Sequence, residues 1–117
     1  MYSAAVLDHF KNPHNAGELP NATVAVHVSN PACGDVLALM AVVEHGRIAD
    51  VRFKASGCVS AIAAGSMLTD MIAGRAVKEA RAVTPERISE ALGGLPPATF
   101  HAAQLARDAL ESLLAKL

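Results

Sequence analysis

The sequence is poor in aromatic residues and has no excess of charge of either sign. Among its 117 residues there are three Phe, one Tyr and no Trp, so we expect no stacking platform for bases or sugars. Ten basic and 11 acidic residues give a formal net charge of −1, whereas phosphate binding needs a basic surplus on one face. These two features argue against nucleic acid as a partner.

Long hydrophobic runs and an N-terminal targeting pattern are also missing. The longest uncharged stretches, Leu19–Gly34 and Ala55–Thr69, are too short and too rich in Ser, Gly and Asn to span a bilayer. The first dozen residues carry Asp8 and His9 and do not show a basic segment followed by an apolar stretch, so no signal peptide is predicted. We therefore predict a cytoplasmic protein with no membrane role. In a reducing compartment, the two cysteines favour a metal-binding or sulfur-carrying thiolate over a disulfide.

An apolar content of 52% over this length predicts one domain, residues 1–117, with a core of its own. Three strands are expected from alternating or continuous apolar residues. A hairpin turn joins the second and third strands, and Gly46 supplies the positive φ that such a turn needs. On the third strand, Ala49, Val51 and Phe53 are expected to share one face. The predicted strands are Thr23–Asn30, Val36–Glu44 in the centre and Ile48–Ala55.

Helical periodicity and capping residues predict the rest of the chain. Ser3 is a cap for a first helix that carries Tyr2, Val6 and Phe10 on one stripe, and Thr84-Pro85 opens a later helix that Gly93-Gly94 closes. The predicted fold class is α+β, a small three-stranded antiparallel sheet packed by helices. The expected helices cover residues 3–11, 59–73, 77–82, 85–92 and about 98–116.

Four residues predict a metal site. Cys33 lies in a segment of turn-forming residues, and Asp35, two positions on, can point to the same side of an extended chain. Cys58 follows Gly57 at the start of a long helix, where the helix dipole favours the thiolate. His101, in the first turn of the last helix, is expected to be neutral and so able to bind metal.

Two thiolates, a carboxylate and an imidazole are enough for a tetrahedral Zn²⁺, and soft sulfur also suits iron–sulfur chemistry. Spacing alone leaves an alternative open, because the four residues come from three distant stretches. In that alternative, Cys33 and Cys58 are ordinary thiols and His101 is a capping residue.

The remaining histidines are interpreted more simply. His9 and His14 are expected at the surface near the first helix, His27 on a strand face and His45 in the hairpin turn. Lys54, close to Cys58 in the sequence, is interpreted as part of the solvated face of its strand. Met67 and Met71 are expected to be core residues.

Four segments together resemble the IscU/NifU-type iron–sulfur cluster assembly scaffolds, and the resemblance covers nearly the whole chain. The segments occur in the order of that family and with matching intervals. They are Asp8-His-Phe-Lys-Asn-Pro-His-Asn-Ala-Gly17, Pro31-Ala-Cys-Gly-Asp35, Phe53-Lys-Ala-Ser-Gly-Cys-Val-Ser-Ala61 and Leu95-Pro-Pro-Ala-Thr-Phe-His101.

The resemblance implies the SufE/NifU-like α+β fold and a scaffold with no turnover of its own. It implies that Cys33, Asp35, Cys58 and His101 surround one shallow exposed site. At this site, family members build a [2Fe–2S] cluster from iron and from sulfur delivered by a cysteine desulfurase, then pass it to acceptor apo-proteins. Several members bind zinc there.

The chain departs from the family pattern at three positions. Ala102 replaces a third cysteine directly after the histidine, so a cluster would rest on two thiolates together with Asp35 and His101. Val59 replaces a glycine after the second cysteine. Thr99 replaces the lysine that ends the motif read by a dedicated Hsp70-type chaperone, so that motif is degenerate here.

Three functional interpretations follow. The first is a cluster-assembly scaffold that binds iron, a [2Fe–2S] cluster or zinc. The second is a sulfur acceptor, in which Cys33 or Cys58 takes a persulfide from a desulfurase. The third is a degenerate regulatory paralogue that keeps the fold without a cluster.

Overall fold

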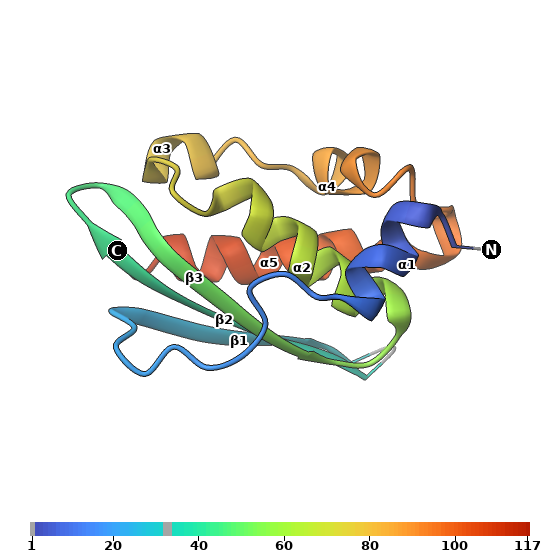
Figure 1. The fold of residues 1–117 in the computed structure, drawn as a ribbon, viewed down its shortest axis with the longest axis horizontal. Coiled ribbons are helices and arrows are strands. Elements are labelled where there is room, and N and C mark those ends of the chain that lie inside the picture. The colour runs from blue at the N-terminus through green and yellow to red at the C-terminus, as the bar shows by residue number, and fades with distance from the viewer. Residues whose placement is uncertain (1, 32–33) are drawn as a thin grey trace.

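The computed structural model describes residues 2–31 and 34–117, so Cys33 lies outside the described residues. One helix precedes three strands, and the remaining helices follow (Figure 1). The elements are α1 Ala4–Lys11, β1 Val24–Asn30, β2 Asp35–Glu44, β3 Arg47–Ser56, α2 Val59–Ile72, α3 Val77–Ala80, α4 Pro85–Ala91, the 3₁₀ helix η1 Pro97–Thr99 and α5 His101–Leu114.

The three strands form one antiparallel sheet in the order β1-β2-β3, with the apolar strand β2 in the centre as predicted. The hairpin between β2 and β3 has His45 and Gly46 as its turn residues, at φ 53° and 75°. Positive φ at both central positions matches the right-handed twist of the flanking strands, which is why a glycine is found here.

The prediction that Ala49 shares the buried face of β3 is wrong. Val42 pairs with Asp50 and Val43 with Ile48, so Ala49 is an extra residue in a β-bulge. The bulge resets the alternation of side chains, and Ile48 and Val51 are buried while Ala49 is exposed.

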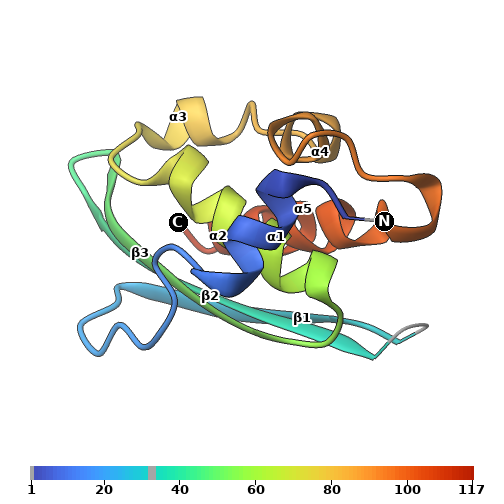
Figure 2. The same ribbon diagram turned by 45° about the vertical axis from the view of Figure 1, so that its right-hand side comes forward.

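Helices α2 and α5 cover one face of the sheet, with α1 and α4 packed on the helices (Figures 1 and 2). The core lies between the sheet and these two helices, and each large aliphatic or aromatic side chain buried there contributes ~1.5–3 kcal/mol relative to full exposure. A smaller apolar cluster of Leu19, Met40 and Val42 lies apart from the main core. The largest core side chains include Phe53, Leu37, Leu39, Leu68, Leu110 and Leu113.

The first helix begins as predicted, because the Ser3 side chain accepts a hydrogen bond from the Val6 N–H at 3.1 Å. Its buried face differs from the predicted stripe. Val6 and His9 are buried, whereas Tyr2 and Phe10 are 42% and 38% exposed. His9 is therefore not a surface residue, which corrects the sequence-based interpretation.

The last helix starts later than predicted. Pro97–Thr99 forms a separate 3₁₀ turn, and α5 begins at His101 and ends at Leu114. Its buried apolar residues run from Ala102 to Leu114, whereas Leu117, which continues the same helical spacing, is 52% exposed. Within residues 2–31 and 34–117, no helix has the length and apolar character needed to cross a bilayer.

Candidate metal centre

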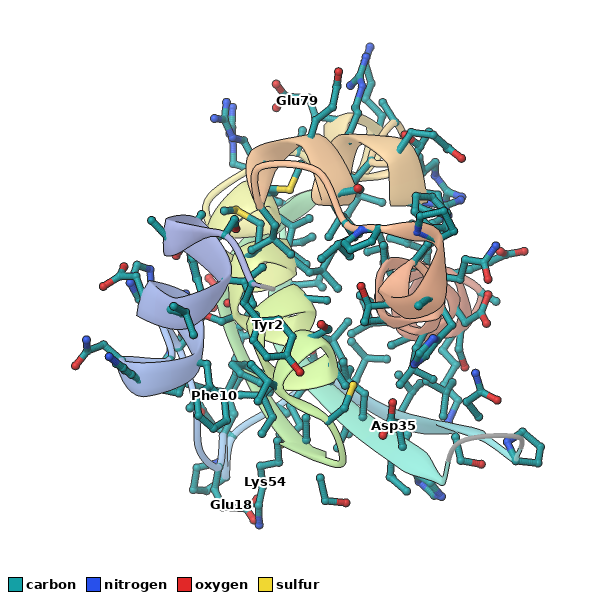
Figure 3. The ribbon with its side chains drawn as sticks, turned by 90° about the vertical axis from the view of Figure 1, so that its right-hand side faces the viewer. Tyr2, Phe10, Glu18, Asp35, Lys54 and Glu79 are labelled. Carbon is teal, nitrogen blue, oxygen red and sulfur yellow. The ribbon has the colours of Figure 1, made fainter. Side chains whose placement is uncertain are left out.

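The candidate centre lies at the end of the sheet where β2 begins. Asp35 is the first residue of β2, and the alternation along the strand places it on the helix-covered face with Leu37 and Leu39. Its exposed fraction is 2%, whereas the next residue, Val36, is 37% exposed on the opposite face. Figure 3 looks onto this end of the molecule and shows Asp35 beside the strand start, below the helices.

The turn between β3 and α2 depends on Gly57. Its φ of +137° is a conformation that other residues rarely adopt, and a Cβ built there would lie 2.0 Å from Oδ1 of Asp35. Only a glycine lets the backbone come this close to the carboxylate. This role of Gly57 was not predicted, and the sequence signal for it was its position immediately before Cys58.

Cys58 is the N-cap residue of α2, as expected from its place in the sequence. Its backbone N–H donates to Oδ1 of Asp35 at 3.0 Å, and its Sγ accepts from the Ala61 N–H at 3.4 Å. The thiol also donates to Oδ2 of Asp35 at 3.5 Å. The start of the helix therefore holds both the sulfur and the carboxylate.

The expectation that the helix dipole favours the thiolate form of Cys58 is not met. Burial raises the pKa of the Cys58 thiol, and the charge and hydrogen bond of Asp35 raise it further. The backbone hydrogen bonds from Ala61 and Ser60 act in the opposite direction without reversing the shift. A bound cation would favour the thiolate, since metal ligation deprotonates the sulfur.

His101 is the first residue of α5, and its Nε2 lies 3.5 Å from Oδ2 of Asp35. One ligand atom each from Asp35, Cys58 and His101 lie within 4.8 Å of one another. Three of the four predicted ligands are thus close together. The fourth, Cys33, falls outside the described residues, two positions before Asp35 in the chain.

The chemistry of this group suits a metal ion that accepts sulfur, nitrogen and oxygen ligands. Asp35 is buried, while Cys58 and His101 are partly exposed, so one side of the group is open to solvent. The N-terminal ends of α2 and α5 both meet here, and their dipoles favour negative charge on the ligands. A divalent ion in this place would compensate a buried carboxylate and a thiolate together.

Three other residues raised by the sequence are not members of this group. Lys54 is exposed and its Nζ lies 2.7 Å from Oε1 of Glu18. Both residues are labelled near the lower edge of Figure 3. Ala102 is fully buried in α5 and supplies no ligand. Thr99 ends the 3₁₀ turn, after the exposed residues 96–98.

Fold and site together define a class of protein: an α+β domain with helices on one face of a three-stranded antiparallel sheet and, at one end, sulfur, oxygen and nitrogen atoms placed so that they could hold a metal ion. The NifU-like N terminal domain family matches residues 1–117. The chain belongs to this family.

Relatives in sequence are named as iron–sulfur cluster assembly scaffolds. The chain is 44% identical over 110 residues to Iron-sulfur cluster assembly scaffold protein IscU 1 of Archaeoglobus fulgidus, covering 94% of this chain and 72% of that protein. It is 42% identical over 118 residues to the scaffold protein IscU of Escherichia coli strain K12, covering 97% and 91%.

Solved structures share the fold. A NifU-like protein (N-terminal) from Brucella abortus has a TM-score of 0.80 at 17% identity, over 97% of this chain and 92% of that one. A putative iron–sulfur cluster assembly scaffold protein for the SUF system from Fervidobacterium islandicum has a TM-score of 0.76 at 24% identity, over 97% and 96%. The predicted α+β fold is therefore confirmed.

Proposed function

We propose that this protein is an iron–sulfur cluster assembly scaffold that holds its cargo with Cys33, Asp35, Cys58 and His101. The observation that carries the proposal is the approach of ligand atoms from Asp35, Cys58 and His101 to within 4.8 Å. Relatives at 42–46% identity are named as scaffolds of this kind. The cargo is iron, a [2Fe–2S] cluster or, at the same ligands, zinc.

The ligand types support a transient cargo. Thiolates are the usual ligands of iron–sulfur clusters, and Cys33 and Cys58 are the only two cysteines in the sequence. The remaining ligands are a carboxylate and an imidazole, which are harder donors than sulfur. With two thiolates, a cluster is held less firmly than by four, which suits a protein that passes its cargo on.

Partners follow from the same function. A cysteine desulfurase supplies the sulfur and acceptor apo-proteins take the finished cluster. The segment on which an Hsp70-type chaperone would dock is Leu95–Thr99, whose residues 96–98 are exposed. Thr99 lacks the positive charge of lysine, so we expect weaker chaperone binding than in relatives with the full motif.

At Cys58, the role of cluster ligand has more support than that of persulfide acceptor. Attack on a persulfide requires a thiolate, and the raised pKa of Cys58 disfavours this form in the metal-free protein. After incubation with a desulfurase in the absence of iron, mass spectrometry should detect no stable persulfide on Cys58. A stoichiometric persulfide there would favour the acceptor function instead.

Anaerobic reconstitution tests the scaffold directly. Purified protein is incubated with Fe²⁺, cysteine and a desulfurase, and iron, acid-labile sulfide and visible absorption are measured. We expect sulfur-to-iron charge-transfer bands with equal amounts of iron and sulfide, and loss of both in Cys58→Ser. His27→Gln, at an exposed strand position, is the matched control and should show the same visible absorption as the wild type. If the protein shows no visible absorption under conditions in which a three-cysteine relative does, cluster assembly is rejected.

A further inference from the structure

A second group of metal-ligating side chains lies away from the candidate metal centre. It comprises His9 on α1, His14 in the following loop and Asp70 on α2. One ligand atom from each lies within 4.8 Å of the others. Asp70 follows Cys58 by twelve positions along α2, which is ~18 Å at 1.5 Å per residue. The two groups therefore cannot share one ion.

His9 is the fixed member of this group. It is 6% exposed, and its Nδ1 lies 2.7 Å from Oγ of Ser66 on α2. The same hydroxyl oxygen accepts the backbone N–H of His14 at 2.7 Å. In the tautomer that donates from Nδ1 to Ser66, the Nε2 lone pair of His9 is left for a ligand, an orientation typical of metal-binding histidines.

The surroundings of His9 shift the pKa of its ring. Burial lowers the pKa of His9, and the nearby His14 lowers it further, against smaller opposing effects of Asp70 and Asp8. The His9 and His14 rings are close, with centroids 4.5 Å apart.

His14 and Asp70 form the accessible side of the group. Their side chains are 43% and 37% exposed, with Nδ1 of His14 2.5 Å from Oδ2 of Asp70. Asn15 supports the carboxylate, because its Nδ2 donates to Oδ1 of Asp70 at 3.4 Å and to Oγ1 of Thr69 at 3.1 Å. These exposed side chains can move toward the fixed His9 ring, which shortens the separations to those of ligands around one ion.

We propose that His9, His14 and Asp70 form a second metal site, which takes a divalent first-row transition metal ion such as Zn²⁺ or Fe²⁺. Two imidazoles and one carboxylate, with room for solvent ligands on the exposed side, suit such an ion. Because the site has no thiolate, it differs in chemistry from the candidate metal centre. It also joins α1 and its loop to α2, which lie side by side in Figures 1 and 2.

Metal titration in a thiolate-free background tests this site. In Cys33→Ser/Cys58→Ser, we expect saturable binding of one Zn²⁺ per chain by calorimetry, at least 10-fold weaker after adding His14→Gln or Asp70→Asn. His27→Gln, an exposed histidine on β1, serves as the matched control and should leave the affinity unchanged. Absence of saturable binding, or binding that neither substitution weakens, overturns the proposal.

Two further measurements keep the test valid if a variant folds poorly. Co²⁺ bound in the thiolate-free background should show ligand-field bands without sulfur charge transfer. In NMR spectra of the same protein, Co²⁺ should shift or broaden the ring signals of His9 and His14 before those of His27 and His45. Perturbation of His101 first would place the ion at the candidate metal centre and overturn the second site. Since no cysteine is present, the outcome is independent of cluster assembly.

Discussion

Asp35 connects the parts of the candidate metal centre at the scale of single residues. The Cys58 N–H, the Cys58 thiol and Nε2 of His101 lie 3.0, 3.5 and 3.5 Å from its carboxylate oxygens. A buried carboxylate with these neighbours orients the sulfur and the imidazole before any ion binds. Such preorganisation is what a binding site needs to hold a metal without first reorganising.

The pKa of Cys58 gives a prediction about pH. In metal-free Cys33→Ser, the alkylation rate of Cys58 should rise with pH, with a midpoint above that of an ordinary cysteine, because burial and Asp35 both disfavour the thiolate. Asp35→Asn removes the charge and should lower the midpoint. The exposed Asp108→Asn is the control. A midpoint that Asp35→Asn raises or leaves unchanged contradicts this account.

Gly57 gives a second prediction at this scale. Gly57→Ala should weaken Zn²⁺ or Fe²⁺ binding at the candidate metal centre by 10-fold or more, roughly the effect of losing a supporting contact, because the new Cβ displaces Asp35. Gly74→Ala is the matched control, since Gly74 also has a positive φ, of +75°, with no atom within 4 Å of a built Cβ. Equal loss of metal affinity in both variants would assign the effect to backbone strain alone.

At the scale of elements, α2 both begins at the candidate metal centre and packs across β3. At Gly65 the helix comes close to the sheet, because a Cβ built there would lie 2.7 Å from Cδ2 of Phe53 and 3.1 Å from Cδ1 of Leu37. A glycine inside a helix costs ~1 kcal/mol in propensity. Here it lets the Phe53 ring lie directly against the helix backbone.

Gly65→Ala is therefore expected to destabilise the protein although alanine is the better helix former. Phe53 is 2% exposed and cannot move aside, and overpacking costs ~1–3 kcal/mol. We expect a net loss of about 1 kcal/mol in the free energy of unfolding by denaturant titration. Phe53→Leu in the Gly65→Ala background should recover part of that loss, measured as a double-mutant cycle. A more stable Gly65→Ala variant would show that the ring has room to shift.

At the scale of the whole molecule, the candidate metal centre joins the start of β2 to the first turns of α2 and α5. Asp35, Cys58 and His101 are far apart in the sequence, and only the folded chain brings them within 4.8 Å. An ion that binds the native state but not the unfolded chain stabilises the whole fold.

Metal addition and removal should therefore change thermal stability. In Asp70→Asn, chosen to disable the second site, Zn²⁺ at 100 times its Kd should stabilise the fold by about 2.7 kcal/mol. This corresponds to a rise in Tm on the order of 10 °C, which a chelator should reverse. The rise should be absent when Cys58→Ser is added. An equal rise with and without Cys58 would mean that the stabilising ion binds elsewhere.

Local patterns were enough to predict most of the elements. The central strand, the hairpin turn at Gly46 and the capped starts of α1 and α4 were all predicted, because each depends on residues near one another in the chain. The bulge at Ala49 was not predicted, since it arises from pairing between two strands. For the same reason the burial of His9 was missed, because it depends on Ser66 of another helix.

The sequence by itself determined the fold class, the strand order and the four residues expected to bind a metal, because periodicity, turn residues and motif order are local properties. Only the tertiary structure decided which residues meet. It brought Asp35, Cys58 and His101 together, raised the pKa of Cys58 through burial and the Asp35 charge, and grouped His9 with His14 and Asp70. Distances between remote residues and the burial of a charge depend on packing, which no local pattern encodes.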